Sequence, residues 1–280
     1  MPRRKNVKVV ESFGHEWSRF KNDKAELEST LHAQFSAYSA PLKNFVIGPN
    51  AVAADFGAGS GRWDKYFARL VKTLIVVEPS SDAIAVAKKN LHNEINIIFK
   101  NESIEECSIE NHSLDLAISL GVLHHTDNTE IALGKINEKL KPGGIFLCYL
   151  YYDLENKPAW YRTIWKLSDV IRKVFSKLPK SLKIVFAEII AFTVYLPFAR
   201  VALLAQKTGA DSTLIPLHHY AKMPIYMMRN DALDRFGTQV ERRYNRAQIS
   251  HLLLATGFNT TTLQFSELEP FWTFAVRKNF

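Results

Sequence analysis

A short apolar segment that runs into three closely spaced glycines limits the folds open to this chain. Residues 51–56 are small and apolar, which is typical of a strand buried on both faces of a parallel sheet. Gly57, Gly59 and Gly61 follow, and residues 62–70 have the character of a helix. A strand, a glycine turn and a helix in this order bring the backbone close to a ligand above a helix N-terminus. The segment therefore predicts a nucleotide-binding turn.

The acids around this turn indicate which nucleotide it binds. A second strand over residues 74–77 ends in Glu78, 21 residues after Gly57, where an acid can bind ribose hydroxyls. A dinucleotide turn has glycines at offsets 0, 2 and 5, but here the offsets are 0, 2 and 4. Asp55 also adds a carboxylate that a bound pyrophosphate has little use for. These features disfavour a dehydrogenase.

The pattern Asp-x-Gly-x-Gly-x-Gly at the end of a first strand resembles motif I of class I S-adenosylmethionine-dependent methyltransferases. The resemblance implies S-adenosylmethionine as the cofactor, with Asp55 taking its ammonium group. Asn101 or Glu102 would reach the adenine, with Ile104 against the ring, and the sequence does not rank the first two. The cofactor site implied in full is Asp55, Gly57, Ala58, Gly59, Gly61, Glu78, Pro79, Asn101, Glu102, Ile104 and Leu120.

The later segments predict the rest of an α/β fold. Further strands are expected over residues 95–99, 114–120, 145–150, 260–265 and 271–276, with helices over residues 83–90, 128–140 and 246–256. Residues 141–144, Lys-Pro-Gly-Gly, predict a helix stop and turn, and a helix that ends this way is another resemblance to the family. We predict a doubly wound, mostly parallel seven-stranded Rossmann-like sheet with an inserted helical lid.

Three parts of the chain are expected. Residues 1–45 would form a helical segment whose Phe13, Trp17 and Phe20 share one helix face. This segment either closes over the cofactor or substrate, as in some bacterial methyltransferases that it resembles, or packs on the core. Residues 46–150 and 246–280 would form the cofactor-binding core, and residues 151–245 a mainly helical insertion.

The insertion holds most of the positive charge. Residues 151–245 contain 15 basic and 8 acidic residues, whereas residues 1–150 contain 18 of each. An apolar stripe from Trp160 to Leu178 has basic residues on its other faces, and an apolar run follows over residues 184–205. Glu188 and Arg200 disfavour a membrane span there, because a charge at the bilayer centre costs about 2.5–3.5 kcal/mol, and Pro197 is expected to kink or split the run. Three interpretations remain open: a lid over an apolar substrate, docking of residues 160–205 on an anionic membrane surface, and an oligomer interface.

The candidate catalytic groups are histidines. His124 and His125 follow the fourth strand, where a base for a hydroxyl acceptor would lie, although such a pair could instead shape the cofactor pocket. His218 and His219, in the insertion, are weaker candidates. Substrate contacts are expected from Tyr149, Tyr152 and Tyr220, besides the aromatic residues of the N-terminal segment. The histidine spacing does not indicate a metal site.

The sequence favours a methyltransferase that acts on a small-molecule acceptor, apolar or lipid-linked, with O-methylation preferred. A nucleic-acid methyltransferase is the first alternative, disfavoured because residues 121–125 lack the Pro-Pro motif of base-amine enzymes. A non-catalytic S-adenosylmethionine-binding module is the second. Cys107 and Cys148 do not make a disulfide framework, and no apolar run follows the basic N-terminus. We therefore expect a cytoplasmic protein, peripheral on the inner membrane face if the insertion binds lipid.

Overall fold

The computed structural model describes residues 25–155, 157–238, 240–267 and 271–280. The chain divides into two compact units, one comprising Met1–Asp153 with Val240–Phe280 and the other Leu154–Gln239. The predicted aromatic face of Phe13, Trp17 and Phe20 lies outside the described residues.

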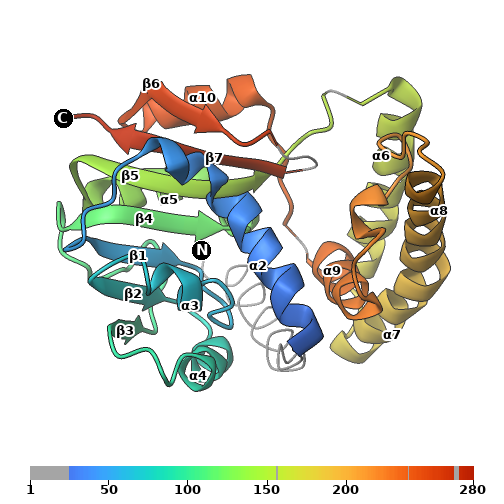
Figure 1. Cartoon of the computed structure of the whole chain (residues 1–280), viewed down its shortest axis with the longest axis horizontal. Helices are drawn as coiled ribbons and strands as arrows, with labels where there is room; N and C mark the ends of the chain where they lie inside the picture. The colour runs from blue at the N-terminus through green and yellow to red at the C-terminus, as the bar shows by residue number, and fades with distance from the viewer. Residues whose placement is uncertain (1–24, 156, 239, 268–270) are drawn as a thin grey trace. The chain divides into compact units, whose positions relative to one another are not determined.

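The first unit is built on a seven-stranded sheet in the order β3-β2-β1-β4-β5-β7-β6 (Figure 1). The strands are β1 Val52–Phe56, β2 Thr73–Val77, β3 Ile97–Lys100, β4 Leu114–Leu120, β5 Leu140–Tyr151, β6 Phe258–Phe265 and β7 Phe271–Lys278. The first five strands pair in parallel, whereas β7 pairs antiparallel with both β5 and β6. This confirms the predicted mostly parallel, doubly wound sheet.

Helices cover both faces of this sheet (Figure 1). They are α2 Ala25–Ser39, η1 Ala40–Asn44, α3 Asp64–Phe67, α4 Ser81–Asn90, η2 Leu123–His125, α5 Thr129–Lys139 and α10 Arg246–Ala255. Side-chain caps fix where three of them begin: Ser80 caps α4, Asn128 caps α5, and Asn245 forms a capping box with Gln248 on α10. Each capped helix therefore begins at a defined residue beside the carboxyl or amino end of a strand.

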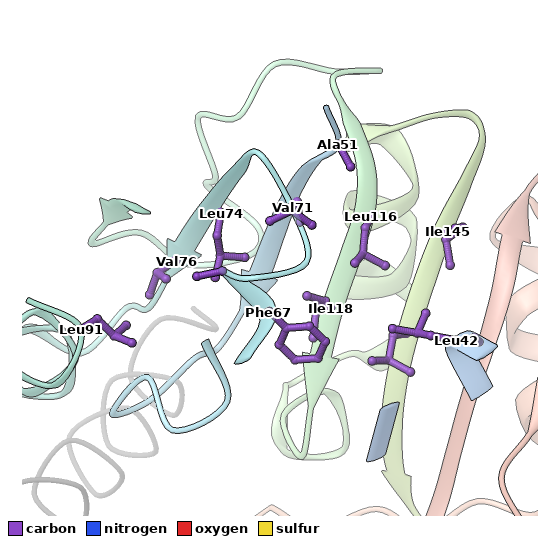
Figure 2. Packing of buried hydrophobic residues seen from close by; sticks show 14 of the residues in the cluster. Leu42, Ala51, Phe67, Val71, Leu74, Val76, Leu91, Leu116, Ile118 and Ile145 are labelled. Carbon is purple, nitrogen blue, oxygen red and sulfur yellow. The ribbon is translucent and has the colours of Figure 1, made fainter. Parts of the chain in front are cut away.

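Apolar side chains from the central strands pack under η1, α3 and α4 (Figure 2). Leu74, Leu116 and Ile118 are fully buried there, and Phe67 of α3 lies against them. Strands covered on both faces are almost continuously apolar, and for this reason the sequence predicts their positions. This core holds the carboxyl ends of β1, β2, β4 and β5 in fixed positions.

The second unit is helical in its described residues. It contains α6 Ala159–Phe175, α7 Lys180–Ile190, the π-helical turn η3 Ala191–Tyr195, α8 Leu196–Lys207, η4 His218–Tyr220 and α9 Ile225–Gly237. Its own small core gathers Ala187, Ala191, Tyr195, Ala199, Tyr220, Met228, Ala232 and Phe236. A bidentate ion pair from Arg229 to Glu188, with N–O distances of 2.6 and 2.7 Å, joins α9 to α7.

Two local predictions differ from the structure. Residues 141–144 lie within β5 instead of forming a turn before it, because a bulge against β4 absorbs the Pro-Gly-Gly segment between Leu140 and Ile145. The apolar run is not divided at Pro197, since Ser181–Lys207 is one helix of 27 residues. The π-helical turn η3 precedes Pro197 and accommodates the irregularity that a proline causes. By length and composition alone, this helix is able to cross a membrane.

Candidate functional site

The predicted cofactor residues of the first unit follow the carboxyl ends of its parallel strands, where open α/β sheets bind ligands. The glycine turn after β1 has positive φ at Gly57 (83°), Gly59 (58°) and Gly61 (73°). A Cβ at Gly57 would lie 2.6 Å from Val122, and one at Gly61 would lie 2.6 Å from Leu91. The turn therefore requires glycine both for its backbone angles and for its packing.

Glu78, at the end of β2, fixes the shape of this turn. Its carboxylate accepts hydrogen bonds from the Gly59 amide at 2.9 Å and from the Ser80 amide at 2.8 Å. Burial raises the pKa of Glu78, although these two N–H donors oppose the rise. Two neighbouring backbone bonds also tie the turn to β2, from the amides of Gly57 and Ala58 to the Val77 carbonyl. Pro79 then leads into the Ser80 cap of α4.

Asp55 and Asp64 form a buried carboxyl pair beneath the glycine turn. Asp55 is the fourth residue of β1, and Asp64 begins α3. Burial raises the pKa of Asp55 to about 7, with nearby Glu78 adding to the rise, and it raises the pKa of Asp64 well above the ordinary range. Apart from Asp55, the Asp64 oxygens have no hydrogen-bond partner among the described residues. Two such carboxyls share a proton when no cation is present, and they suit a positively charged ligand group.

The segment after β3 separates the two candidates for adenine contact. The Asn101 amide donates to the Glu78 backbone carbonyl at 2.8 Å, so this side chain lies beside Glu78. The Glu102 carboxylate instead accepts from the amide and hydroxyl of Ser108 and has a lowered pKa because of those bonds. Ile104 is buried and Leu120, the last residue of β4, packs at the edge of the core. The two candidates therefore differ in their partners: Asn101 binds the chain at Glu78, and Glu102 is held by Ser108.

The two histidines of η2 differ in their surroundings. His124 is fully buried, stacks on Tyr151 with a centroid distance of 3.8 Å, and has no hydrogen-bond partner for either ring nitrogen in the described part of the chain. Burial holds its pKa well below the ordinary range, so the ring is neutral at pH 7. His125 Nδ1 lies 2.6 Å from the Val240 carbonyl oxygen. Because a carbonyl only accepts, Nδ1 carries a proton, and the neutral form of this ring has its lone pair on Nε2.

Aromatic side chains gather beside these histidines. Tyr38 of α2 lies 5.4 Å from Trp63 and 5.2 Å from Tyr149, measured between ring centroids. Tyr149 in turn lies 5.8 Å from Tyr151, the residue that stacks on His124. Tyr152 points away from this group, since it is buried against Trp272 of β7. The cluster joins α2, the glycine turn and the end of β5.

The remaining candidates belong to the second unit. His218 Nδ1 lies 3.2 Å from the Ile215 carbonyl, and Tyr220 donates to Asp231 at 2.6 Å. Burial, together with His218, lowers the pKa of His219 to about 3, so this ring is neutral near pH 7. Among the described residues, no group of three or more His, Cys, Asp or Glu side chains could hold a metal ion.

Sequence reasoning missed Asp64, Tyr38 and Trp63. Asp64 and Trp63 stand directly after the glycine turn, in a segment treated only as a helix, and α3 covers just residues 64–67 of it. An acid three residues past the last glycine was a usable signal. Tyr38 had no such signal, because its place beside β5 depends on how α2 packs.

Comparison with known proteins agrees with this geometry. A family model described as a methyltransferase domain matches residues 54–148. Residues 54–148 therefore form a methyltransferase domain. It is 32% identical over 108 residues to a ubiquinone/menaquinone biosynthesis C-methyltransferase of Rubrivivax gelatinosus, covering 38% of this chain and 40% of that protein. It is also 32% identical over 96 residues to a ubiquinone biosynthesis O-methyltransferase of a Bradyrhizobium strain, covering 33% and 37%.

Solved structures show the same fold for the methyltransferase domain. Human N-acetylserotonin methyltransferase in complex with S-adenosylmethionine aligns with a TM-score of 0.53 at 15% identity, covering all of this chain and 60% of that one. A putative methyltransferase of Listeria monocytogenes aligns with a TM-score of 0.52 at 16% identity, covering 88% and 99%. The chain spans at most about 40% of the length of the curated relatives it matches.

Proposed function

We propose that this chain transfers a methyl group from S-adenosylmethionine to a hydroxyl group of an apolar, aromatic small molecule. The observation that carries the proposal is the Asp55–Asp64 pair beneath the glycine turn. Buried carboxyls with raised pKa values are costly unless a ligand neutralises them. An ammonium group would do so, whereas a pyrophosphate would add further negative charge.

The chain's own residues would bind and orient both reactants. Asp55 and Asp64 would hold the ammonium group, Glu78 the ribose hydroxyls, and Asn101 the adenine. Bound S-adenosylmethionine supplies a methyl group already attached to a sulfonium leaving group. The protein therefore contributes mainly proximity and orientation, with the rigid ends of β1, β2 and β4 fixing the geometry.

The acceptor side is inferred from the aromatic cluster and from His125. Tyr38, Trp63, Tyr149 and Tyr151 offer ring faces and edges on which a planar acceptor would stack. His125, held by the Val240 carbonyl with its lone pair on Nε2, would accept the proton of the acceptor hydroxyl. The names of the relatives, which include both C- and O-methyltransferases of quinone biosynthesis, support an acceptor of this kind.

A methyl-transfer assay tests the proposal. Purified protein would be incubated with S-adenosylmethionine and alkyl-substituted catechols or hydroquinones, and mass spectrometry would detect methylated products and the demethylated cofactor. We expect methyl ethers that are absent with the Asp55→Asn variant. Cofactor binding without any methylated product across such a panel would support a binding module instead.

A further inference from the structure

The helices α6, α7 and α8 present large apolar side chains to solvent. Of the 21 large hydrophobic residues exposed in the described part of the chain, 13 lie between Trp160 and Leu204, and each is 40–65% exposed. Monomeric soluble proteins rarely expose contiguous apolar surface on this scale. We call these 13 residues the apolar face: Trp160, Ile164, Leu167, Val170, Ile171, Val174, Leu182, Val185, Ile189, Phe192, Phe198, Val201 and Leu204.

Helix α6 leaves a stripe of apolar side chains exposed to solvent. Its exposed apolar residues recur at the i, i+4, i+7, i+11 spacing of one helix face, from Trp160 onward. The opposite side carries Arg172, which is only 3% exposed, donates to the Thr238 carbonyl at 2.9 Å and pairs with Asp169 at 2.7 Å. A surface helix normally turns its polar side to water. The inward side also carries Phe175, which stacks on Phe186 with a centroid distance of 3.4 Å, so the unit has its own apolar contacts and still leaves the stripe from Trp160 uncovered.

The long helix Ser181–Lys207 repeats this arrangement. Small residues such as Ala187, Ala191 and Ala199 are buried in the unit's own core, so that side of the helix is already occupied. Leu182, Val185, Ile189 and Phe192 recur every three or four residues on the exposed side. Only 22% of its most apolar 18-residue window is buried. The exposed side is therefore available to a partner.

The charge around the apolar face is positive. Residues 159–207 include nine Lys or Arg and two acids, and both acids are engaged within the unit: Asp169 with Arg172 and Lys173, and Glu188 with Arg229. Lys166 and Lys173 lie four and three residues from Val170 on one edge of α6, and Lys177 follows in the turn after this helix. Arg162, Arg200 and Lys207 are also exposed. A partner for this surface combines apolar and anionic chemistry.

We propose that the apolar face docks on an anionic phospholipid bilayer, with α6 and the helix Ser181–Lys207 lying in the membrane interface. Apolar side chains would enter the acyl boundary while the lysines bind lipid phosphates. A second copy of the chain fits less well, because a symmetric contact would bring two basic edges together. A bilayer span fits less well, because the Glu188–Arg229 pair ties this helix to α9. The proposal gives this protein a peripheral position on a membrane.

Vesicle flotation of the purified 280-residue chain tests the proposal without any methyl-transfer readout. We expect flotation with vesicles of phosphatidylcholine and phosphatidylglycerol, and little with phosphatidylcholine alone. Leu167→Glu with Val174→Glu should lower binding at least tenfold. The matched control is Leu254→Glu with Ile131→Glu on α10 and α5 of the first unit, because Leu254 and Leu167 are 62% and 63% exposed. The control should float like the wild-type chain.

Charge variants distinguish binding to anionic lipid from non-specific hydrophobic association. The double variant Lys166→Gln, Lys177→Gln should weaken binding to anionic vesicles about 30-fold, because each positive charge lost near an anionic surface lowers affinity about fivefold. Unchanged thermal unfolding would show that each variant is folded. The proposal is overturned if neither vesicle binds, or if the apolar-face and control variants bind alike. If the bound protein resists extraction by alkaline carbonate and binds neutral vesicles equally well, the helix spans the bilayer. If the protein forms dimers that do not bind vesicles, the apolar face is a self-association surface. Either result contradicts the proposal.

Discussion

Replacing Asp55 by Asn should make the ligand-free protein more stable at neutral pH while weakening cofactor binding. The pKa of Asp55 is about 7 in the fold, against an ordinary value of 3.8. At 1.36 kcal/mol per pKa unit, ionising this buried group lowers the free energy of unfolding by on the order of 4 kcal/mol. The Asn side chain has nearly the same shape and does not ionise, so it removes this cost.

The sign of the pH dependence follows from proton binding. Because the folded-state pKa of Asp55 is raised, its contribution to stability is complete below about pH 4 and is lost as pH rises to about 7. From pH 5 to pH 7.5 the free energy of unfolding of the wild-type chain should therefore fall by roughly 2–3 kcal/mol more than that of Asp55→Asn. In a unit of this size that corresponds to a difference of roughly 5–10 °C in Tm.

Thermal unfolding of both proteins at several pH values measures this difference directly. Binding should show the opposite trend, because a cationic ligand favours ionised carboxylates. Wild-type affinity for S-adenosylmethionine should rise about tenfold from pH 6 to pH 8, as expected for a group with a pKa near 7, and should be weak and nearly flat in the variant. Parallel Tm profiles for the two proteins would refute the reasoning.

Three further predictions concern the same site. Gly57 has a φ of 83°, and a Cβ added there would lie 2.6 Å from Val122, so Gly57→Ala should lower the free energy of unfolding by about 1–3 kcal/mol and abolish the thermal shift with cofactor. Gly48→Ala, at a position with open space around it, should change neither. Glu78→Gln keeps an acceptor for one of the two amides but loses the charge, and calorimetry should show cofactor affinity lowered about tenfold or more. In steady-state kinetics, His125→Asn should reduce kcat about 100-fold with little change in cofactor KM, and a reduction no larger than that of His124→Asn would contradict its role as the base.

The sheet of the first unit was predictable because its signals are local. Strands buried on both faces are continuous apolar runs, and the glycine turn is fixed by positions where only glycine fits. The fifth strand was placed too late, since a bulge lets Pro142 and its two glycines enter a strand that pattern reasoning ends before them. Asp64 was overlooked although it follows the last glycine by three residues, and its pairing with Asp55 is visible only in the structure.

The second unit shows the limit of periodicity as a guide. The stripe beginning at Trp160 correctly located a helix, but spacing does not tell which side of a helix faces inward. The stripe is exposed, whereas the inward side buries Arg172 and stacks Phe175 on Phe186. The expectation that this unit acts as a lid over the substrate stays a prediction, as do the roles of His218, His219 and Tyr220.

A calorimetric titration of the purified chain with S-adenosylmethionine, its demethylated product and NAD tests the central claim most directly. We expect both sulfur compounds to bind with one-to-one stoichiometry. Because both carry an amino-acid ammonium group, their affinity should depend on Asp55. NAD should not bind. Binding of NAD alone, or binding of S-adenosylmethionine that Asp55→Asn leaves unchanged at pH 8, would contradict the account.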